Sequence, residues 1–143
     1  MKKFLAALTA VALVALVASC GPSVPDTSAL KGLLVKNNTD AAAFAQVVDT
    51  ATDAKALAEG ITAFTAASVS FSADYKAEMD KHPEFATLSE ASMPADLKQA
   101  LADQATAKTA VAAAVGKLNS SPLLSDPAVT EAYQKLAAAS GAK

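Results

Sequence analysis

The sequence predicts an all-α protein: an antiparallel helical bundle of about four helices that follows a short N-terminal tether. Alanine fills 31 of the 124 positions from Cys20 to Lys143. Alanine has the highest helix propensity because its side chain loses no entropy in a helix. Apolar residues recur three and four positions apart, and prolines or Asn/Ser clusters separate these periodic segments. Because alanine buries little area, we expect close helix packing, and a protein partner or self-association.

The stretch before the main bundle is expected to be extended and then briefly helical. Gly21 to Pro25 holds two prolines and is typical of a tether. A short helix is predicted over Asp26–Lys36, with Asp26 as its N-cap. The cluster Asn37-Asn38-Thr39 favours a turn, so we expect this helix to end there.

Two main helices are predicted next. Thr39 or Asp40 caps a helix that runs to about Ala51. Asp53 caps a long helix that ends at about Lys81, because the residue before Pro83 avoids the α region. A short turn of helix is expected from Pro83 to Glu90.

The last two helices both begin with proline in or beside the first turn, where the missing backbone donor does no harm. The third main helix starts at Ser92-Met93-Pro94 and runs to about Leu118. The fourth is capped by Asp126, runs from Pro127 to about Ala139 and closes at Gly141.

The long helix and the third helix are expected to pair directly, because both carry apolar stripes with the seam spacing of antiparallel helices. Ser68 opposite Lys108 would form a polar layer that fixes the register. Alternatively, the Lys108 stem lies along the stripe and its ammonium reaches water. The predicted pairs are Met79 with Leu97, Tyr75 with Leu101, Phe71 with Ala105, Ser68 with Lys108, Phe64 with Ala112, Ile61 with Val115 and Leu57 with Leu118.

The N-terminus has the features of an export signal. Lys2 and Lys3 are followed by Phe4 to Ala18, a run of 15 residues without charge, and then by small residues. A transmembrane helix needs about 20 apolar residues, so a stable membrane-spanning helix is the weaker interpretation.

Val17-Ala18-Ser19-Cys20 resembles the lipobox of bacterial lipoproteins, with Val in place of the commoner Leu and Ser in place of the commoner Gly or Ala. The resemblance implies that the Cys20 thiol receives a diacylglycerol and that the chain is cut after Ser19. It also implies an N-acyl chain such as palmitate on the new N-terminus. Two or more acyl chains hold a protein firmly to a bilayer, whereas one holds it only marginally. The alternative is a buried structural cysteine or an ordinary signal cleavage nearby.

This interpretation gives the chain three parts: residues 1–19 as a removed signal peptide, 20–38 as lipidated cysteine and tether, and 39–143 as the helical bundle. The protein would be exported and bound to the membrane through its lipid anchor. In Gram-negative lipoproteins an Asp after the cysteine favours inner-membrane retention. Gly21 stands there in this chain, so the resemblance favours the outer membrane.

The composition excludes several functions. The mature chain has 10 lysines, no arginine and 14 acidic residues, so it lacks the basic face that nucleic-acid binding requires. Its single cysteine cannot form an internal disulfide. With one histidine and no glycine-rich phosphate loop, no catalytic residues and no cofactor-binding residues are predicted, and we expect no enzymatic activity.

Asp74, Glu78 and His82 form the one constellation that could carry chemistry, because their i, i+4, i+8 spacing places them on one helix face. Glu and His one turn apart can ligate a divalent metal. The alternative is a solvated edge with His82 near the helix C-terminus, where a cation is favoured. We favour this alternative and predict no metal site.

The helix starts also resemble those of small helical bacterial lipoproteins of uncharacterised function. The resemblance is carried by His82-Pro83-Glu84-Phe85, Pro94-Ala95-Asp96-Leu97 and Asp126-Pro127-Ala128-Val129. It implies a helical bundle and no activity. The expected role is therefore a lipid-anchored, non-enzymatic binding or structural module of the cell envelope. The alternative is a small-ligand or metal carrier that uses a crevice between the helices near Tyr75 and His82.

Overall fold

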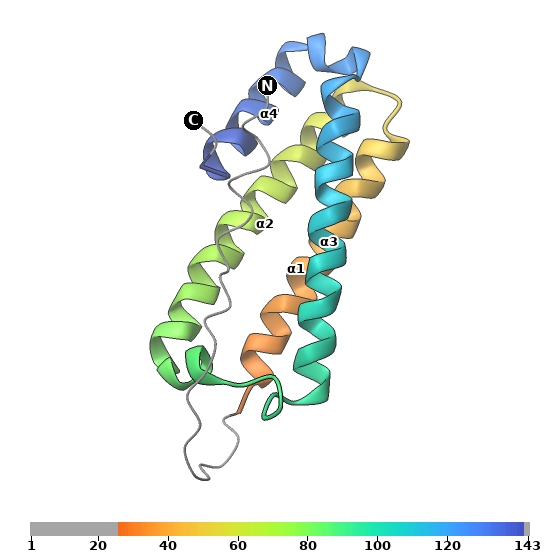
Figure 1. Cartoon of the computed structure of the whole chain (residues 1–143). Coiled ribbons are helices and arrows are strands. Elements are labelled where there is room, and N and C mark those ends of the chain that lie inside the picture. The colour runs from red at the N-terminus through yellow and green to blue at the C-terminus, as the bar shows by residue number, and fades with distance from the viewer. Residues whose placement is uncertain (1–25, 142–143) are drawn as a thin grey trace.

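The computed structural model describes residues 26–141 of the chain. Successive α-helices run in opposite directions (Figure 1), which confirms the predicted all-α antiparallel bundle. The predictions for residues 1–25, including Ser19 and Cys20, lie outside the described residues. The helices are α1 (Ser28–Thr50), α2 (Ala54–Lys81), α3 (Ala95–Asn119) and α4 (Pro127–Ala139), with short 3₁₀ helices η1 (Pro83–Thr87) and η2 (Pro122–Ser125).

The starts of α2 and α4 have the predicted capping residues. The Asp53 carboxylate accepts a hydrogen bond from Ala56 N at 2.8 Å, and the Asp126 carboxylate accepts one from Ala128 N at 2.8 Å. In α1 the N-cap is Thr27 and not the predicted Asp26, although the Asp26 carboxylate accepts a hydrogen bond from Ser28 N at 2.9 Å. These bonds satisfy backbone donors that have no partner within the helix.

The predicted break at Asn37-Asn38-Thr39 is wrong, because α1 continues through it as one helix. The Thr39 hydroxyl donates to Val35 O at 3.0 Å, and Lys36 pairs with Asp40 at 2.7 Å on the helix surface. Asn38 Nδ2 donates to Ala100 O of α3 at 3.1 Å. Contacts within α1 and to α3 therefore override the low helix propensity of this segment.

The predicted direct pairing of the long helix with the third helix is also wrong. α1 packs against both α2 and α3, and α2 packs against α4 as well as α1, whereas α2 and α3 do not pair directly. Lys31 Nζ lies 2.8 Å from Asp96 Oδ2, and Lys117 Nζ lies 2.6 Å from Asp49 Oδ1. These ion pairs join α1 and α3 near both of their ends, so the two helices run parallel, as Figure 1 shows.

The α1–α3 interface explains the error, because the buried face of α3 is partly alanine. Its buried residues follow a heptad spacing that a search for large apolar residues does not detect. Ala105, which we expected to face Phe71, is exposed, whereas the adjacent Gln104 is buried. The buried residues of α3 are Leu97, Ala100, Gln104, Val111, Ala114 and Leu118.

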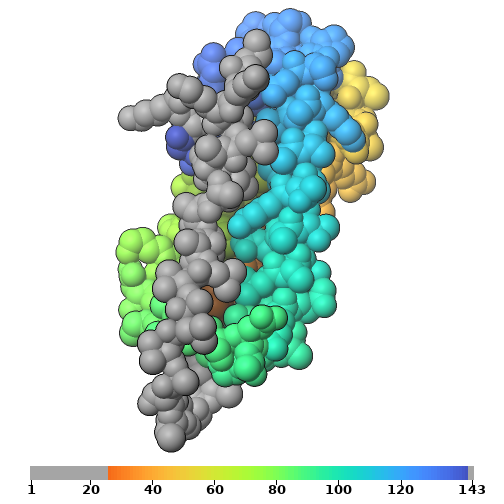
Figure 2. All heavy atoms as spheres, viewed as in Figure 1, coloured from red at the N-terminus to blue at the C-terminus, as the bar shows by residue number. Residues whose placement is uncertain are grey.

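The core consists of two hydrophobic clusters, one toward each end of the bundle. The first lies at the end where α4 and η2 pack against α2, and its large buried residues are Phe44, Leu57, Ile61, Leu118 and Val129. The second lies where η1 closes the other end, and its buried residues are Leu30, Leu34, Phe85, Leu97 and Ala100. Figure 2 shows the atoms of η2 and α4 gathered at one end and those of η1 at the other.

Candidate functional site

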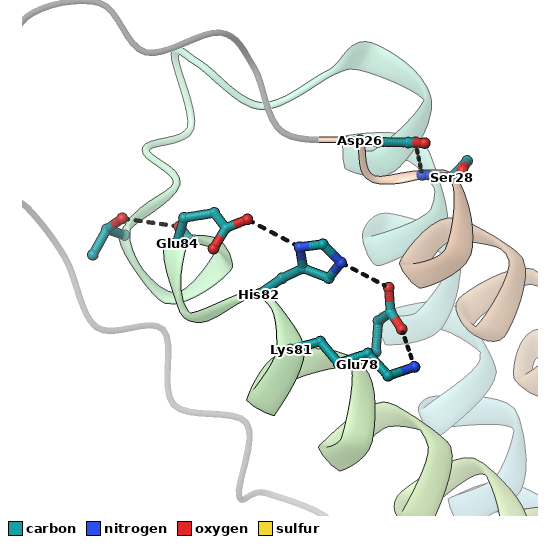
Figure 3. Close-up of polar contacts among 7 residues, drawn as sticks. Asp26, Ser28, Glu78, Lys81, His82 and Glu84 are labelled. Carbon is teal, nitrogen blue, oxygen red and sulfur yellow. Dashed lines mark hydrogen bonds and ion pairs between the residues drawn. The ribbon is translucent and has the colours of Figure 1, made fainter.

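His82 is the centre of the polar cluster at the η1 end of the bundle (Figure 3). It is the C-cap of α2, and its backbone N–H donates to Glu78 O at 3.1 Å. Pro83 then begins η1, so the chain turns sharply directly after the histidine. The turn places residues of α2 and η1 on both sides of the imidazole ring.

Both ring nitrogens of His82 face carboxylates. His82 Nδ1 lies 3.0 Å from Glu84 Oε1, and His82 Nε2 lies 3.6 Å from Glu78 Oε1. The ring also stacks on Phe85, with 4.8 Å between ring centroids and 22° between planes. Because neither nitrogen is directed at a hydroxyl or thiol, this geometry joins the end of α2 to η1 and lacks the nucleophile–base contact of a catalytic dyad.

The carboxylates of this cluster have several partners. Glu78 is buried, and its Oε2 lies 3.5 Å from Lys81 Nζ. The pKa of Glu84 is lowered, first by a hydrogen bond from its own backbone N–H and then by the His82 side chain. The pKa of Asp26 is lowered mainly by hydrogen bonds from Ser28, with a smaller effect from the charge of His82. Asp26 thus brings the start of α1 into the same electrostatic environment.

The structure separates the predicted metal candidates. Glu78 and His82 lie together, but Asp74 is exposed and accepts a hydrogen bond from Ser70 Oγ at 3.1 Å. Among residues 26–141, no group of three or more His, Cys, Asp or Glu side chains is arranged to hold a metal ion.

The crevice proposed near Tyr75 is lined by core residues. Tyr75 and Phe71 pack against the cluster that contains Leu30, Leu34 and Phe85, with their rings 5.6 Å apart. Burial raises the pKa of Tyr75, as expected for a hydroxyl group on an aromatic ring that has lost water.

Two shallow grooves lie elsewhere on the described surface. One, of about 560 Å³, lies beside the start of α1 and is lined by residues that include Asp26, Lys31, Val35 and Asp96. The other, of about 470 Å³, lies between α2 and α4, and its lining combines alanines with Glu59, Glu131 and Lys135. Both are open to solvent, so neither has the enclosed apolar lining that is typical of small-molecule sites.

Sequence reasoning missed Glu84 and Phe85 as partners of His82. In the sequence, His82-Pro83-Glu84-Phe85 predicts a helix boundary, because proline follows the last helical residues. A tight turn at Pro83 returns the next side chains toward the end of the preceding helix, so the motif did contain a signal for this cluster.

Comparisons of the chain with protein-family models, curated proteins and solved structures gave no match. No helix within residues 26–141 is long and apolar enough to cross a bilayer. The functional interpretation therefore depends on the sequence signals and on the geometry described above.

Proposed function

We propose that this protein is an exported lipoprotein, anchored to a bacterial membrane through acyl chains on Cys20, whose bundle is a non-enzymatic binding or structural module of the envelope. The observation that carries the proposal is Val17-Ala18-Ser19-Cys20, which follows a basic N-terminus and a short apolar run. A diacylglyceryl thioether supplies two acyl chains at one residue, which is sufficient for stable anchoring. The outer membrane is the expected destination if the cell is Gram-negative.

The geometry supports a module more than a carrier. The carrier alternative needs a ligand set or an enclosed cavity, and Asp74 lies apart from Glu78 and His82. The aromatic side chains near Tyr75 pack into the core. His82 joins two structural elements through both ring nitrogens. The His82 contacts join the end of α2 to η1, and the aromatic side chains pack α2 against the core at the same end.

Metabolic labelling with a tagged palmitate analogue tests the anchor. The full-length chain, expressed in a bacterium, should incorporate the label and enter the detergent phase on phase separation. Cys20→Ala should abolish incorporation, because the thiol is the attachment atom. Ser23→Ala, a matched change three residues away, should leave incorporation unchanged. Label in the Cys20→Ala variant, or none in the wild type, would refute the proposal.

Crosslinking in native membranes separates a module from a carrier. A module should crosslink reproducibly to one protein or to a second copy of itself. A monomer that retains a small molecule in native mass spectrometry would favour the carrier.

A further inference from the structure

The end of the bundle from which the tether leaves has a defined position in the fold. Asp26 lies at the start of α1, beside η1 and the start of α3 (Figures 1 and 3). The Lys31–Asp96 ion pair at 2.8 Å holds the starts of α1 and α3 together. Leu30, Phe85 and Leu97 pack in one cluster directly inside this end. The tether therefore joins a packed part of the bundle.

The reach of the tether limits how far this end can lie from the bilayer. Six peptide steps separate Cys20 from Asp26. A fully extended chain gains at most about 3.6 Å per residue, so the span is no more than about 22 Å. α3 has 25 residues and is about 37 Å long at 1.5 Å per residue. The opposite end, with η2 and α4, lies farther along the bundle than the tether can reach.

The charge at the tethered end opposes close docking onto anionic lipid. Residues 26–31, 76–90 and 93–98 form this end, and carboxylates there outnumber lysines by six to four. The carboxylates of this end include Asp26 and Glu84, and hydrogen bonds lower the pKa of both. An excess of carboxylates is repelled by anionic headgroups within a Debye length of about 8 Å.

The sides of the bundle offer little that would hold it flat on the bilayer. The large hydrophobic residues exposed in the described part of the chain are Val35 and Val69, at 48% and 54%. They lie on α1 and α2 and stand as single residues, whereas membrane-surface helices present a continuous apolar face with lysine or arginine around it.

We infer that the bundle is held end-on to the lipid bilayer, with the end formed by Asp26, η1 and the start of α3 facing the headgroups within about 22 Å, and with η2 and α4 pointing away. This inference rests on the proposed acylation of Cys20. It makes the η2–α4 end the surface that is accessible to other envelope components. The η1 end, including His82, faces the membrane.

Site-directed fluorescence on the acylated protein in vesicles tests this arrangement. Acylation blocks the Cys20 thiol, so an added cysteine is the sole free thiol for labelling. The positions are Glu90→Cys beside η1, Val69→Cys in the middle of α2 and Thr52→Cys between α1 and α2 at the far end, all exposed. With a quencher attached to lipid headgroups, we expect the strongest quenching at position 90, less at 69 and least at 52. Equal quenching at 69 and 52, or the reverse order, would overturn the inference.

Flotation of the protein with the vesicles separates this inference from the proposed function. If the wild-type protein does not float with the vesicles, the anchor itself is refuted; if it floats but shows no gradient, only the end-on arrangement is refuted. Duplicating Gly21–Pro25 should weaken quenching at position 90 without reducing flotation. Adding anionic lipid should not strengthen that quenching, and an increase would show that the tethered end docks through charge.

Discussion

Gly60 of α2 lies so close to Val47 of α1 that a Cβ atom on Gly60 would be 2.4 Å from Val47 Cγ1 and 3.1 Å from Val47 Cβ. Real Cβ atoms essentially never lie closer than 3.0 Å to such an atom, so the contact with Val47 Cγ1 would be a clash. The missing side chain thus lets α1 and α2 approach closely beside the turn that joins them. Gly60 lowers the helix propensity of α2, but it lies where the two helices meet and a side chain would not fit.

Gly60→Ala should destabilise the protein by about 1–3 kcal/mol, because the overpacking outweighs the gain in helix propensity. Gly116→Ala is the matched control, since a Cβ on Gly116 of α3 meets nothing within 4 Å. It should raise the free energy of unfolding by up to about 1 kcal/mol. Urea unfolding of the two variants, followed by circular dichroism, measures both changes. Stabilisation by Gly60→Ala would contradict the close α1–α2 approach.

Asn38→Leu should raise the free energy of unfolding by about 1 kcal/mol. Asn38 Oδ1 is buried and has no hydrogen-bond partner, whereas Nδ2 donates to Ala100 O at 3.1 Å. The leucine removes the unpaired acceptor and has a higher helix propensity. Asn38→Asp should instead destabilise the protein, because it removes the donor and places an additional acceptor beside Ala100 O. If both variants destabilise equally, Asn38 is not placed as described.

Phe44→Ala should reduce the free energy of unfolding by about 3–5 kcal/mol. Phe44 is 2% exposed, and its ring stacks on Phe64 of α2 with 4.4 Å between centroids. Val69→Ala, at an exposed position on the same bundle, should change stability by no more than about 0.5 kcal/mol. Chemical denaturation gives both values. A small effect of Phe44→Ala would contradict the burial of Phe44 in the core between α1 and α2.

Stability should fall as the pH drops below about 4.5. The hydrogen bond from Lys31 lowers the pKa of Asp96 below its usual 3.8, and backbone and His82 contacts lower the pKa of Glu84 below 4.5. The folded state therefore binds fewer protons than the unfolded state. The stabilisation is present above the unfolded pKa and is lost as the pH falls through the folded value.

Urea midpoints between pH 7 and pH 3 measure this effect. Asp96→Asn and Lys31→Met should each flatten the acid decline, and the double variant should flatten it no further than either single change. Additive effects in the double variant would show that the two residues act separately.

Much of the fold could be predicted from local signals. Asp53, Pro83 and Asp126 mark helix ends through capping bonds and a missing backbone donor, which act over a few residues. The break at Asn37-Asn38-Thr39 was also a local prediction, but it failed because Asn38 bonds to α3, 62 residues away. A contact at that separation leaves no pattern in the local sequence.

Which helices pack against each other could not be predicted from the sequence, because alanine occupies both buried and exposed positions. Ala100 and Ala114 are buried in the interface with α1, whereas Ala105 and Ala112 are exposed. The predicted stripe of large residues on α3 shares Leu97, Val111 and Leu118 with the buried face, but it misses the small and polar residues that are buried beside them. At the candidate site, helical spacing predicted the approach of Glu78 to His82, but the contribution of Glu84 depends on the turn at Pro83.

The central claim, that acyl chains on Cys20 hold this helical bundle to a membrane, is tested most directly by the intact mass of the native protein purified from bacterial membranes. We expect a chain from Cys20 to Lys143 that carries a diacylglyceryl group, with or without a further amide-linked acyl chain. A mature chain that begins at another residue, or that begins at Cys20 without added lipid, would contradict the claim.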